Sequence, residues 1–432
     1  MDKEQWRVWL TNYLPSRVAD KVEPEMIGQH GCASGTRIEP RVMKPDDDDF
    51  VIDPYPVFRY LRHFEPLHRS DTGAWVLTRH ADILQALADP RLGNAPSEHA
   101  AVNARNRDRF VCADVAANIL PFINPPQHTL PRAIVSRRFH QYLRQHPVPY
   151  REFAREQLAR VSDKPRIDCL GDFATPLACR VFMHLLQLPD EDQEKLIDWS
   201  EHLLYLFTAL PSEDLRQAID RALGEFRAYL SDHYDSSPCV LHQLLQAADE
   251  NGRRLEPQQI IDNLMLLFAD GIGNTDKAMA STLVCLQRHP EQLRRLQQDP
   301  SLVAPAIDEC LRFESPAQYI GRVAREDVEW YGQTIKANET VLLVLASANR
   351  DETVFNNPDQ LDITRTPNPH VSFGKSRHSC IGGPLVRQEL VEVVSELLPV
   401  IEQIEVDFDK LVWDCRPGHR WLSYCPITLG SA

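Results

Sequence analysis

The sequence has no two cysteines at the C-x-x-C spacing that is typical of zinc ribbons. Its ten cysteines are scattered along the chain, and a chain of this size does not need a disulfide framework in order to fold. We therefore expect reduced thiols in a cytoplasmic protein. Any cysteine with a special role should owe that role to its neighbours.

Long apolar runs are also missing. No window reaches the roughly 18 apolar residues that a membrane-spanning helix needs. Residues 1–22 are charged throughout and lack a small-residue cleavage site, so we expect no signal peptide. These absences predict a cytoplasmic protein that does not associate with a membrane.

Positive charge is in deficit, because the formal net charge is −15 at pH 7. A general nucleic-acid-binding protein would show a basic face, so the balance argues against that class. It does not exclude a local basic patch. The content of 43% hydrophobic and 25% charged residues is ordinary for a globular protein.

The patterning predicts one large, mainly helical domain with a minor β part. Residues 1–50 are irregular and read as a solvated lead-in, whereas 51–432 should form a single catalytic domain. Residues 91–120 have weak periodicity, which predicts a long, mobile connection of the kind that often binds ligands. Helical periodicity runs over 125–290. After residue 315, VEWYG, QTIKA and VLLVLAS read as strands, and a final helix begins near Pro384.

The strongest helical pattern begins near Pro257 and stops at Pro290. Its middle reads ADGIGNTD, at 269–276, and contains two glycines, two aspartates, an asparagine and a threonine. These residues rank poorly in helix interiors, where glycine costs about 1 kcal/mol against alanine. Poor helix formers in the middle of a mostly apolar helix suggest a functional reason for their presence.

Cys380 lies in the loop FGKSRHSCIGG, residues 373–383, just before the final helix. The positive end of that helix favours a thiolate, and the glycines let the backbone approach a flat group closely. Arg377 and His378 are placed to meet negative groups. A thiolate flanked by cations is what a heme iron with anionic propionates needs, but a buried cysteine in an ordinary turn fits these residues as well.

The loop resembles the heme-binding signature of the cytochrome P450 family, FGxGxHxCxG. Ser376 stands where the second glycine is expected, so the turn there must accommodate a Cβ. The resemblance implies that Cys380 ligates the iron of heme b and that the other matching residues help to hold the heme. The matching residues are Phe373, Gly374, His378, Cys380 and Gly382.

Other motifs of the same family follow in its order. Glu309 and Arg312 form its structural ExxR pair, on one helix face at i, i+3 spacing. His128 and Arg132, in PPQHTLPR, resemble a propionate-binding pair on the family's C helix. Arg322 resembles a further propionate ligand. Because these motifs and the cysteine loop occur in register, the chain is identified as a member of the family.

Membership implies the cytochrome P450 fold, in which a long central helix crosses over the heme. It also implies a monooxygenase that hydroxylates or epoxidises a small hydrophobic substrate, biosynthetic or terpenoid-like, in secondary metabolism. The implied partners are O2 and a separate ferredoxin with its ferredoxin reductase. We expect a monomer without a fused flavin or ferredoxin domain.

A local basic patch is expected on the cysteine side of the heme, and it would suit an acidic electron donor. The alternative is that these residues are merely solvated surface charges. The patch would consist of Arg137, Arg138, Lys375, Arg377 and Arg387.

The central helix departs from the family pattern A-G-x-[D/E]-T. With Gly271 aligned to the motif glycine, Gly273 replaces the acid and Asn274 replaces the threonine, while Thr275 faces about 100° away. Asp270 stands one turn before Asn274, on the same face. Our hypothesis is that Asp270 and Asn274 hold a water or a polar substrate group above the iron. Alternatively, Asp270 turns aside to an arginine or to backbone donors. Separately, we expect Gly271 and Gly273 to clear room for dioxygen and substrate.

Three activities stay open at this point. They are monooxygenation, oxidation without oxygen insertion (coupling, cyclisation or desaturation), and heme binding without turnover, against which the cationic proximal face argues. Five apolar residues are expected to line the substrate pocket, although they could equally be plain core. They are Phe110, Val111, Ile119, Leu267 and Ile320.

Overall fold

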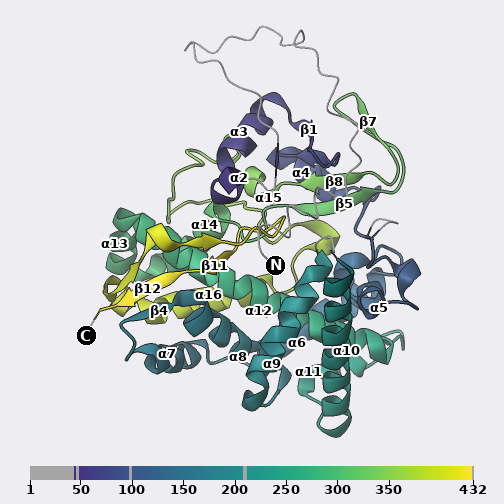
Figure 1. Ribbon diagram of the computed structural model, residues 1–432, viewed down its shortest axis with the longest axis horizontal. Helices are drawn as coiled ribbons and strands as arrows, with labels where there is room; N and C mark the ends of the chain where they lie inside the picture. Colours follow the sequence, from purple (N-terminus) through teal and green to yellow (C-terminus); the bar gives the residue numbers. More distant parts are fainter. Residues whose placement is uncertain (1–42, 45–47, 97–99, 208–211, 431–432) are drawn as a thin grey trace.

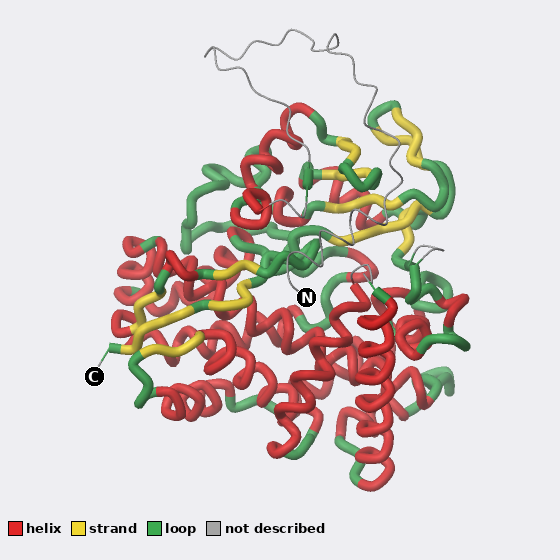
Figure 2. Tube along the Cα trace, in the orientation of Figure 1, coloured by secondary structure: helices red, strands yellow, loops and turns green. Residues whose placement is uncertain are grey.

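The computed structural model describes residues 43–44, 48–96, 100–207 and 212–430. Most of the lead-in expected for residues 1–50 lies outside the described residues. The described chain is mainly helical with a smaller β part (Figure 2), which confirms the expected fold class.

Helices form the larger part of the molecule, in the lower half of Figure 1. Most of them bury an apolar face in one extensive core. The helices are α2 (Asp48–Ile52), α3 (Tyr55–Phe64), α4 (His80–Ala88), α5 (Val111–Asn118), α6 (Thr129–Gln145), α7 (Tyr150–Val161), α8 (Thr175–Leu186), α9 (Gln193–Leu204), α10 (Glu213–Ser236), α11 (Val240–Gln246), α12 (Pro257–Arg288), α13 (Pro290–Gln298), α14 (Val303–Phe313), α15 (Leu345–Ala348) and α16 (Gly383–Leu397).

The strands form two sheets and two hairpins. One sheet has the order β1-β2-β8-β5-β3 and lies with α3 and α4 at the top of Figure 1; the other has the order β4-β12-β9. The hairpins are β6-β7 and β10-β11. The strands are β1 (Leu67–Arg69), β2 (Trp75–Leu77), β3 (Leu92–Gly93), β4 (Arg166–Asp168), β5 (Ile320–Ala324), β6 (Val328–Trp330), β7 (Gln333–Ile335), β8 (Thr340–Leu343), β9 (Ile404–Val406), β10 (Val412–Trp413), β11 (Leu422–Tyr424) and β12 (Pro426–Leu429).

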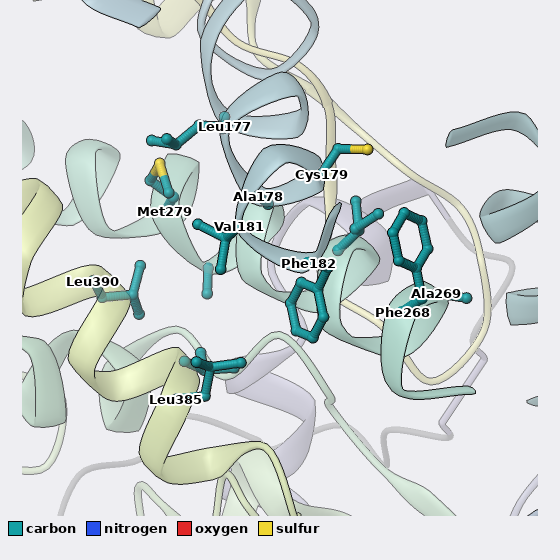
Figure 3. Packing of buried hydrophobic residues seen from close by; sticks show 14 of the residues in the cluster. Leu177, Ala178, Cys179, Val181, Phe182, Phe268, Ala269, Met279, Leu385 and Leu390 are labelled. Carbon is teal, nitrogen blue, oxygen red and sulfur yellow. The ribbon is translucent and has the colours of Figure 1, made fainter. Parts of the chain in front are cut away.

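The long central helix is confirmed as α12. A capping box between Glu256 and Gln259 satisfies its first N–H groups, and Pro257 takes the first turn, where its missing N–H matters least. Figure 3 shows side chains of α8, α12 and α16 gathered in one cluster, and the rings of Phe182 and Phe268 lie 6.3 Å apart. Packing on several sides therefore supports α12 against its poor helix formers.

The structure corrects two local expectations. The segment 91–120 contains α5, so it is not one long irregular connection. The second half of VLLVLAS turns into α15, so only its first half is strand. Residues 269–276 form regular α-helix despite their poor helix formers, because the packing around α12 is continuous there.

One apolar stretch passes a length and hydropathy test for crossing a membrane, which the sequence analysis did not anticipate. This stretch, Cys169–Leu186, has a mean hydropathy of 1.2, but 67% of it is buried within the fold. Such burial is what a core helix shows, so the stretch is weak evidence for a span.

Candidate active site

The loop that carries Cys380 is held by its backbone and by the start of α16. Gly374 and Ser376 both have left-handed φ values, 63° and 62°, so Ser376 keeps its Cβ in a conformation that glycine adopts more easily. The Cys380 N–H donates to the Phe373 carbonyl at 2.8 Å. A Cβ added at Gly383 would lie 3.3 Å from the Phe373 ring. The ring therefore packs closely against the first turn of α16.

The Cys380 thiol is surrounded by groups with opposed effects on its charge. Its side chain is exposed, whereas seven of the nine described cysteines are buried. The sulfur nevertheless lies deep in the protein. Desolvation, and after it the charge of Asp270, raises the pKa of the thiol to about 12. The N–H groups of Gly382 and Gly383 and the charge of Arg132 lower this pKa, but by less. The helix start therefore acts in the expected direction, but desolvation and the charge of Asp270 outweigh it. A metal cation at the sulfur would make the thiolate the stable form.

Basic side chains, two histidines and two arginines, gather beside this loop, and none of them forms an ion pair with another described residue. The rings of His128 and His378 lie 4.1 Å apart, and the buried Nε2 of His128 has no hydrogen-bond partner in the described part of the chain. Arg132 donates from Nη2 to the carbonyl of a loop residue at 2.7 Å. Arg322 is buried and donates from Nη1 only to an adjacent carbonyl, at 2.8 Å.

Burial and mutual repulsion lower the pKa values in this cluster of basic side chains. Burial, then the charges of Arg132 and Arg377, lower the pKa of His128 to about 4. Burial and the neighbouring cations lower the pKa of His378 to about 3, and that of Arg322 to about 10. Buried cations without an anion are costly. The cluster and the single thiol therefore fit a heme, whose propionates are anionic and whose iron takes a thiolate.

The ExxR pair is fully buried and ties α14 to the segment that leads into the cysteine loop. Arg312 donates from Nε and Nη2 to the Glu309 carboxylate, at 2.8 Å each. Its Nη1 donates to the carbonyls of Asn349 and Pro358 at 2.8 and 2.9 Å. Arg365 adds a second cation on Glu309, at 3.0 Å. The pair thus fixes the approach to the loop, as a structural element should.

One face of α12 is partly exposed although most of the helix is buried, and it carries Leu267, Asp270 and Asn274. Asn274 donates from Nδ2 to Oδ1 of Asp270 at 2.7 Å and to its carbonyl at 3.1 Å. Asp270 thus turns to Asn274 and bonds no arginine among the described residues. Burial raises the pKa of Asp270 to about 6, although the hydrogen bond from Asn274 lowers it. Because its charge acts on the Cys380 sulfur, this face looks toward the cysteine loop.

The neighbouring glycines of α12 serve helix packing. A Cβ on Gly271 would lie 2.0 Å from the ring of Phe182 in α8, and one on Gly273 would lie 2.2 Å from Leu204 in α9. The expectation that they clear room for dioxygen and substrate is therefore wrong, because their missing side chains admit α8 and α9. Thr275 is fully buried and its hydroxyl has no partner among the described residues, so it lies off the exposed face, as expected.

The five residues expected to line the pocket occupy different environments. Phe110 lies beneath an arginine of α10, whose guanidinium is 3.9 Å from the ring centroid. Val111 and Ile320 are partly buried, and Ile119 is fully buried in the core. Leu267 shares the partly exposed face of α12 with Asp270. The place of the other four residues in a substrate pocket stays a prediction.

Two residues with a part in the site were missed by sequence reasoning. Asn349 donates to Ser315 and Ser372 at 2.6 and 2.9 Å and accepts from the Val371 N–H at 2.7 Å, just before the cysteine loop. Arg365 completes the buried charge network on Glu309. Asn349 had a signal, since it opens the polar run Asn349-Arg350-Asp351 that follows the ExxR pair along the chain. Arg365 lies in a coil without periodicity and had none.

Comparisons with known proteins agree with this geometry. A family model described as "Cytochrome P450" matches residues 211–399. The "Biotin biosynthesis cytochrome P450" of Bacillus subtilis (strain 168) is 30% identical over 88% of this chain and 97% of that protein. The "Vitamin D(3) 25-hydroxylase" of Pseudonocardia autotrophica is 33% identical over 93% of this chain and 97% of that protein.

Solved structures show the same likeness. The crystal structure of CalO2 has a TM-score of 0.82 at 26% identity, over 90% of this chain and 98% of that one. P450BioI, in complex with hexadec-9Z-enoic acid ligated acyl carrier protein, has a TM-score of 0.79 at 29% identity, over 88% of this chain and 100% of that one. The chain therefore belongs to the cytochrome P450 family and is an oxidoreductase that binds heme b.

Proposed function

We propose that the protein hydroxylates or epoxidises a small hydrophobic substrate, with O2 and with electrons from a separate ferredoxin. One oxygen atom enters the substrate, and the other leaves as water with two electrons and two protons. When bound, heme b supplies the iron that activates O2. The observation that carries the proposal is the placement of Cys380 and its unpaired cations opposite the Asp270–Asn274 face.

The apolar substrate class is supported by Leu267 on the exposed face of α12. It is also supported by the names of relatives, which include biotin biosynthesis, vitamin D(3) hydroxylation and polyketide biosynthesis. One solved relative was crystallised with hexadec-9Z-enoic acid ligated acyl carrier protein, whose acyl group is a long apolar chain. Residues 51–432 would act as one catalytic domain, since one core includes residues from Val102 to Ile427.

Asp270 and Asn274 would handle the polar part of the reaction. A carboxyl whose pKa is about 6 exchanges a proton readily near neutral pH, which suits a proton donor. Asn274 fixes the orientation of this carboxyl through its hydrogen bond. In the proposed role, Asp270 holds a proton or a water on the substrate side of the site, and Asn274 takes the position of the family's threonine as its anchor.

The proposed ferredoxin would dock on the basic patch. Asp308 holds Arg387 at 2.6 Å and Glu250 holds Arg137 at 2.6 Å, so these two charges are partly compensated. Arg138, Lys375 and Arg377 form no ion pair with the described residues. A docking site made of these three residues is smaller than the sequence suggested. It keeps the positive charge that an acidic electron donor needs.

The decisive test of thiolate chemistry is the carbon monoxide difference spectrum of the reduced protein. Cys380→Ser should abolish the thiolate-type band. Cys239→Ser should keep it, because Cys239 is buried in the core at the start of α11, where its sulfur accepts the N–H of His242 at 3.3 Å. A band of unchanged position in Cys380→Ser would refute the assignment.

Product analysis with a ferredoxin and its reductase then separates the activities. Gain of one oxygen atom supports the proposal. Loss of two hydrogens without oxygen gain would instead show coupling, cyclisation or desaturation. Absence of reductant consumption with every apolar substrate tried would indicate heme binding without turnover.

A further inference from the structure

The carbonyl groups on both sides of Cys380 are held by side chains of α6. Arg132 donates from Nη2 to the carbonyl of Ser379 at 2.7 Å. His140 bonds the carbonyl of Ile381 through Nε2 at 3.0 Å. The two side chains are a little over two helical turns apart along α6. One helix therefore fastens the loop immediately before and immediately after the cysteine.

The direction of the bond from His140 follows from its partner. A carbonyl oxygen only accepts hydrogen bonds, so Nε2 of His140 carries a proton and donates it. A neutral ring protonated at Nε2 donates in this way, and so does a charged imidazolium. The bond therefore does not depend on the charge of the ring.

The bond to the loop is not what a helical histidine makes by default in this protein. Four other described histidines, in a helix or at its end, bond through Nδ1 the carbonyl four residues earlier in the same helix. They are His63, His146, His202 and His289. His140 instead uses Nε2 on a carbonyl 241 residues away in the chain. The tertiary fold therefore directs this ring at the cysteine loop.

The bond from His140 reaches the cysteine sulfur through a single peptide group. The carbonyl of Ile381 and the N–H of Gly382 belong to the same planar unit. That N–H donates to the sulfur of Cys380 and lowers the pKa of the thiol. The two groups are close, since a Cβ added at Gly382 would lie 3.9 Å from the sulfur. His140, the Ile381–Gly382 peptide and the sulfur thus form one hydrogen-bonded chain.

Hydrogen bonds in such a chain strengthen one another. Donation to the Ile381 carbonyl draws electron density from the peptide nitrogen, so the N–H of Gly382 becomes a stronger donor. A stronger donor withdraws charge from a thiolate sulfur. Because a thiolate with less charge stabilises the oxidised state of an iron less, the reduced state becomes easier to reach.

We propose that His140 is a positioning residue that acts through the Ile381–Gly382 peptide to weaken electron donation by the Cys380 thiolate, and thereby raises the reduction potential of the bound heme. The consequence for turnover is that an electron from the donor protein is accepted more readily. The assignment rests on ligation of the heme iron by Cys380, which is part of the proposed function.

The test measures the heme reduction potential, the iron–sulfur stretching frequency and the melting temperature of the heme-loaded protein. His140→Phe keeps a ring but has no donor. It should shift the equilibrium of heme reduction toward the oxidised form by about 3- to 10-fold, which is roughly 30–60 mV for one electron. The iron–sulfur stretching frequency should rise, because the sulfur donates more strongly.

Two amides that differ by one methylene group separate donation from bulk. His140→Gln places its amide nitrogen about as far from Cβ as Nε2 of histidine, so it should restore most of the wild-type potential. His140→Asn carries the same amide too close to the backbone to reach the carbonyl, so it should behave like His140→Phe. His146→Phe is the matched control at the end of α6, because His146 bonds a carbonyl of its own helix, and it should leave the potential unchanged.

Equal potentials in wild type, His140→Phe and His140→Asn would overturn the assignment. Equal shifts in the Gln, Asn and Phe variants, together with a lower melting temperature, would show that His140 only ties α6 to the loop, which overturns it as well. The carbon monoxide difference spectrum of wild type separates this result from the proposed function. A thiolate-type band with an insensitive potential refutes the role of His140 alone, whereas a missing band refutes ligation by Cys380 and both proposals with it.

Discussion

At the residue scale, the distal site combines one acid and one amide that lie a helical turn apart. Asn274 bonds both the side chain and the carbonyl of Asp270. The two residues therefore form a pair that acts as a unit, and neither is a simple copy of the family's acid and threonine. The other carboxyl oxygen of Asp270 accepts no hydrogen bond from the described residues, so it can meet a water or a substrate group.

Two substitutions of Asp270 distinguish the contribution of its acidic proton from that of its side-chain shape. Asp270→Ala should lower the turnover rate and raise the fraction of reducing equivalents lost without product, because the polar group above the site is gone. Asp270→Asn keeps the shape without an exchangeable acidic proton and should show most of the same loss. Unchanged substrate affinity, coupling and product pattern in both variants would exclude the role.

The pH dependence of this site follows from the raised pKa of Asp270, about 6, against about 3.9 for an unfolded aspartate. Between these values the folded protein binds the extra proton, so its stability falls as pH rises from about 4 to 6. Above pH 6 the carboxyl is ionised and cannot donate. We expect kcat/KM of wild type to decline with an inflection near pH 6, and Asp270→Asn to lack that inflection. A profile shared by both proteins would assign the inflection to another group.

At the element scale, two glycines let α8 and α9 approach α12 closely. A Cβ at either position would enter a side chain of the facing helix. Because protein interiors are close-packed, adding even one methyl group there changes the packing and the stability. The poor helix formers in the middle of α12 thus have two separate reasons, since the polar residues face the site and the glycines face the neighbouring helices.

Glycine-to-alanine substitutions in α12 and in α10 should change the unfolding free energy in opposite directions. Gly271→Ala should destabilise the protein by about 1–2 kcal/mol, because overpacking against Phe182 outweighs the gain in helix propensity. Gly224→Ala, in α10, has nothing within 4 Å of the added Cβ and should stabilise by about 0.5–1 kcal/mol. Urea unfolding of both variants measures the difference. Equal shifts in the two variants would show that close packing at α12 does not matter.

At the scale of the whole molecule, one buried charge network connects the helical part to the cysteine loop. Glu309 of α14 holds Arg312 and Arg365, and Arg312 binds carbonyls of the coil before the loop. A break in this network would leave buried cations unpaired. The position of Cys380 therefore depends on residues far from it in sequence.

Glu309→Gln should cost about 3–5 kcal/mol of unfolding free energy and accelerate heme loss, because two buried guanidinium groups lose their carboxylate. Glu396→Gln is the matched control, since its partner Arg155 is 66% exposed, and it should cost less than about 1 kcal/mol. Denaturation and heme transfer to an acceptor protein measure both effects. Similar losses in the two variants would mean that the ExxR network is dispensable.

The sequence predicted much of the fold and of the proximal site. The limits of α12 followed from periodicity and proline positions, and Cys380 with its cations followed from an ordered set of motifs. The helix α5 and the turn α15 were missed, because their residues show weak or ambiguous local periodicity. Tertiary contacts decide such segments.

The sequence by itself determined the family, the heme ligand, the order of the motifs and the face that Asp270 shares with Asn274, because these depend on residue type and spacing along one chain. Only the tertiary structure decided that Asn274 binds Asp270 directly, that Gly271 and Gly273 admit α8 and α9, and that Arg365 joins Glu309. Each of these facts depends on contacts between segments distant in sequence, which no local pattern encodes.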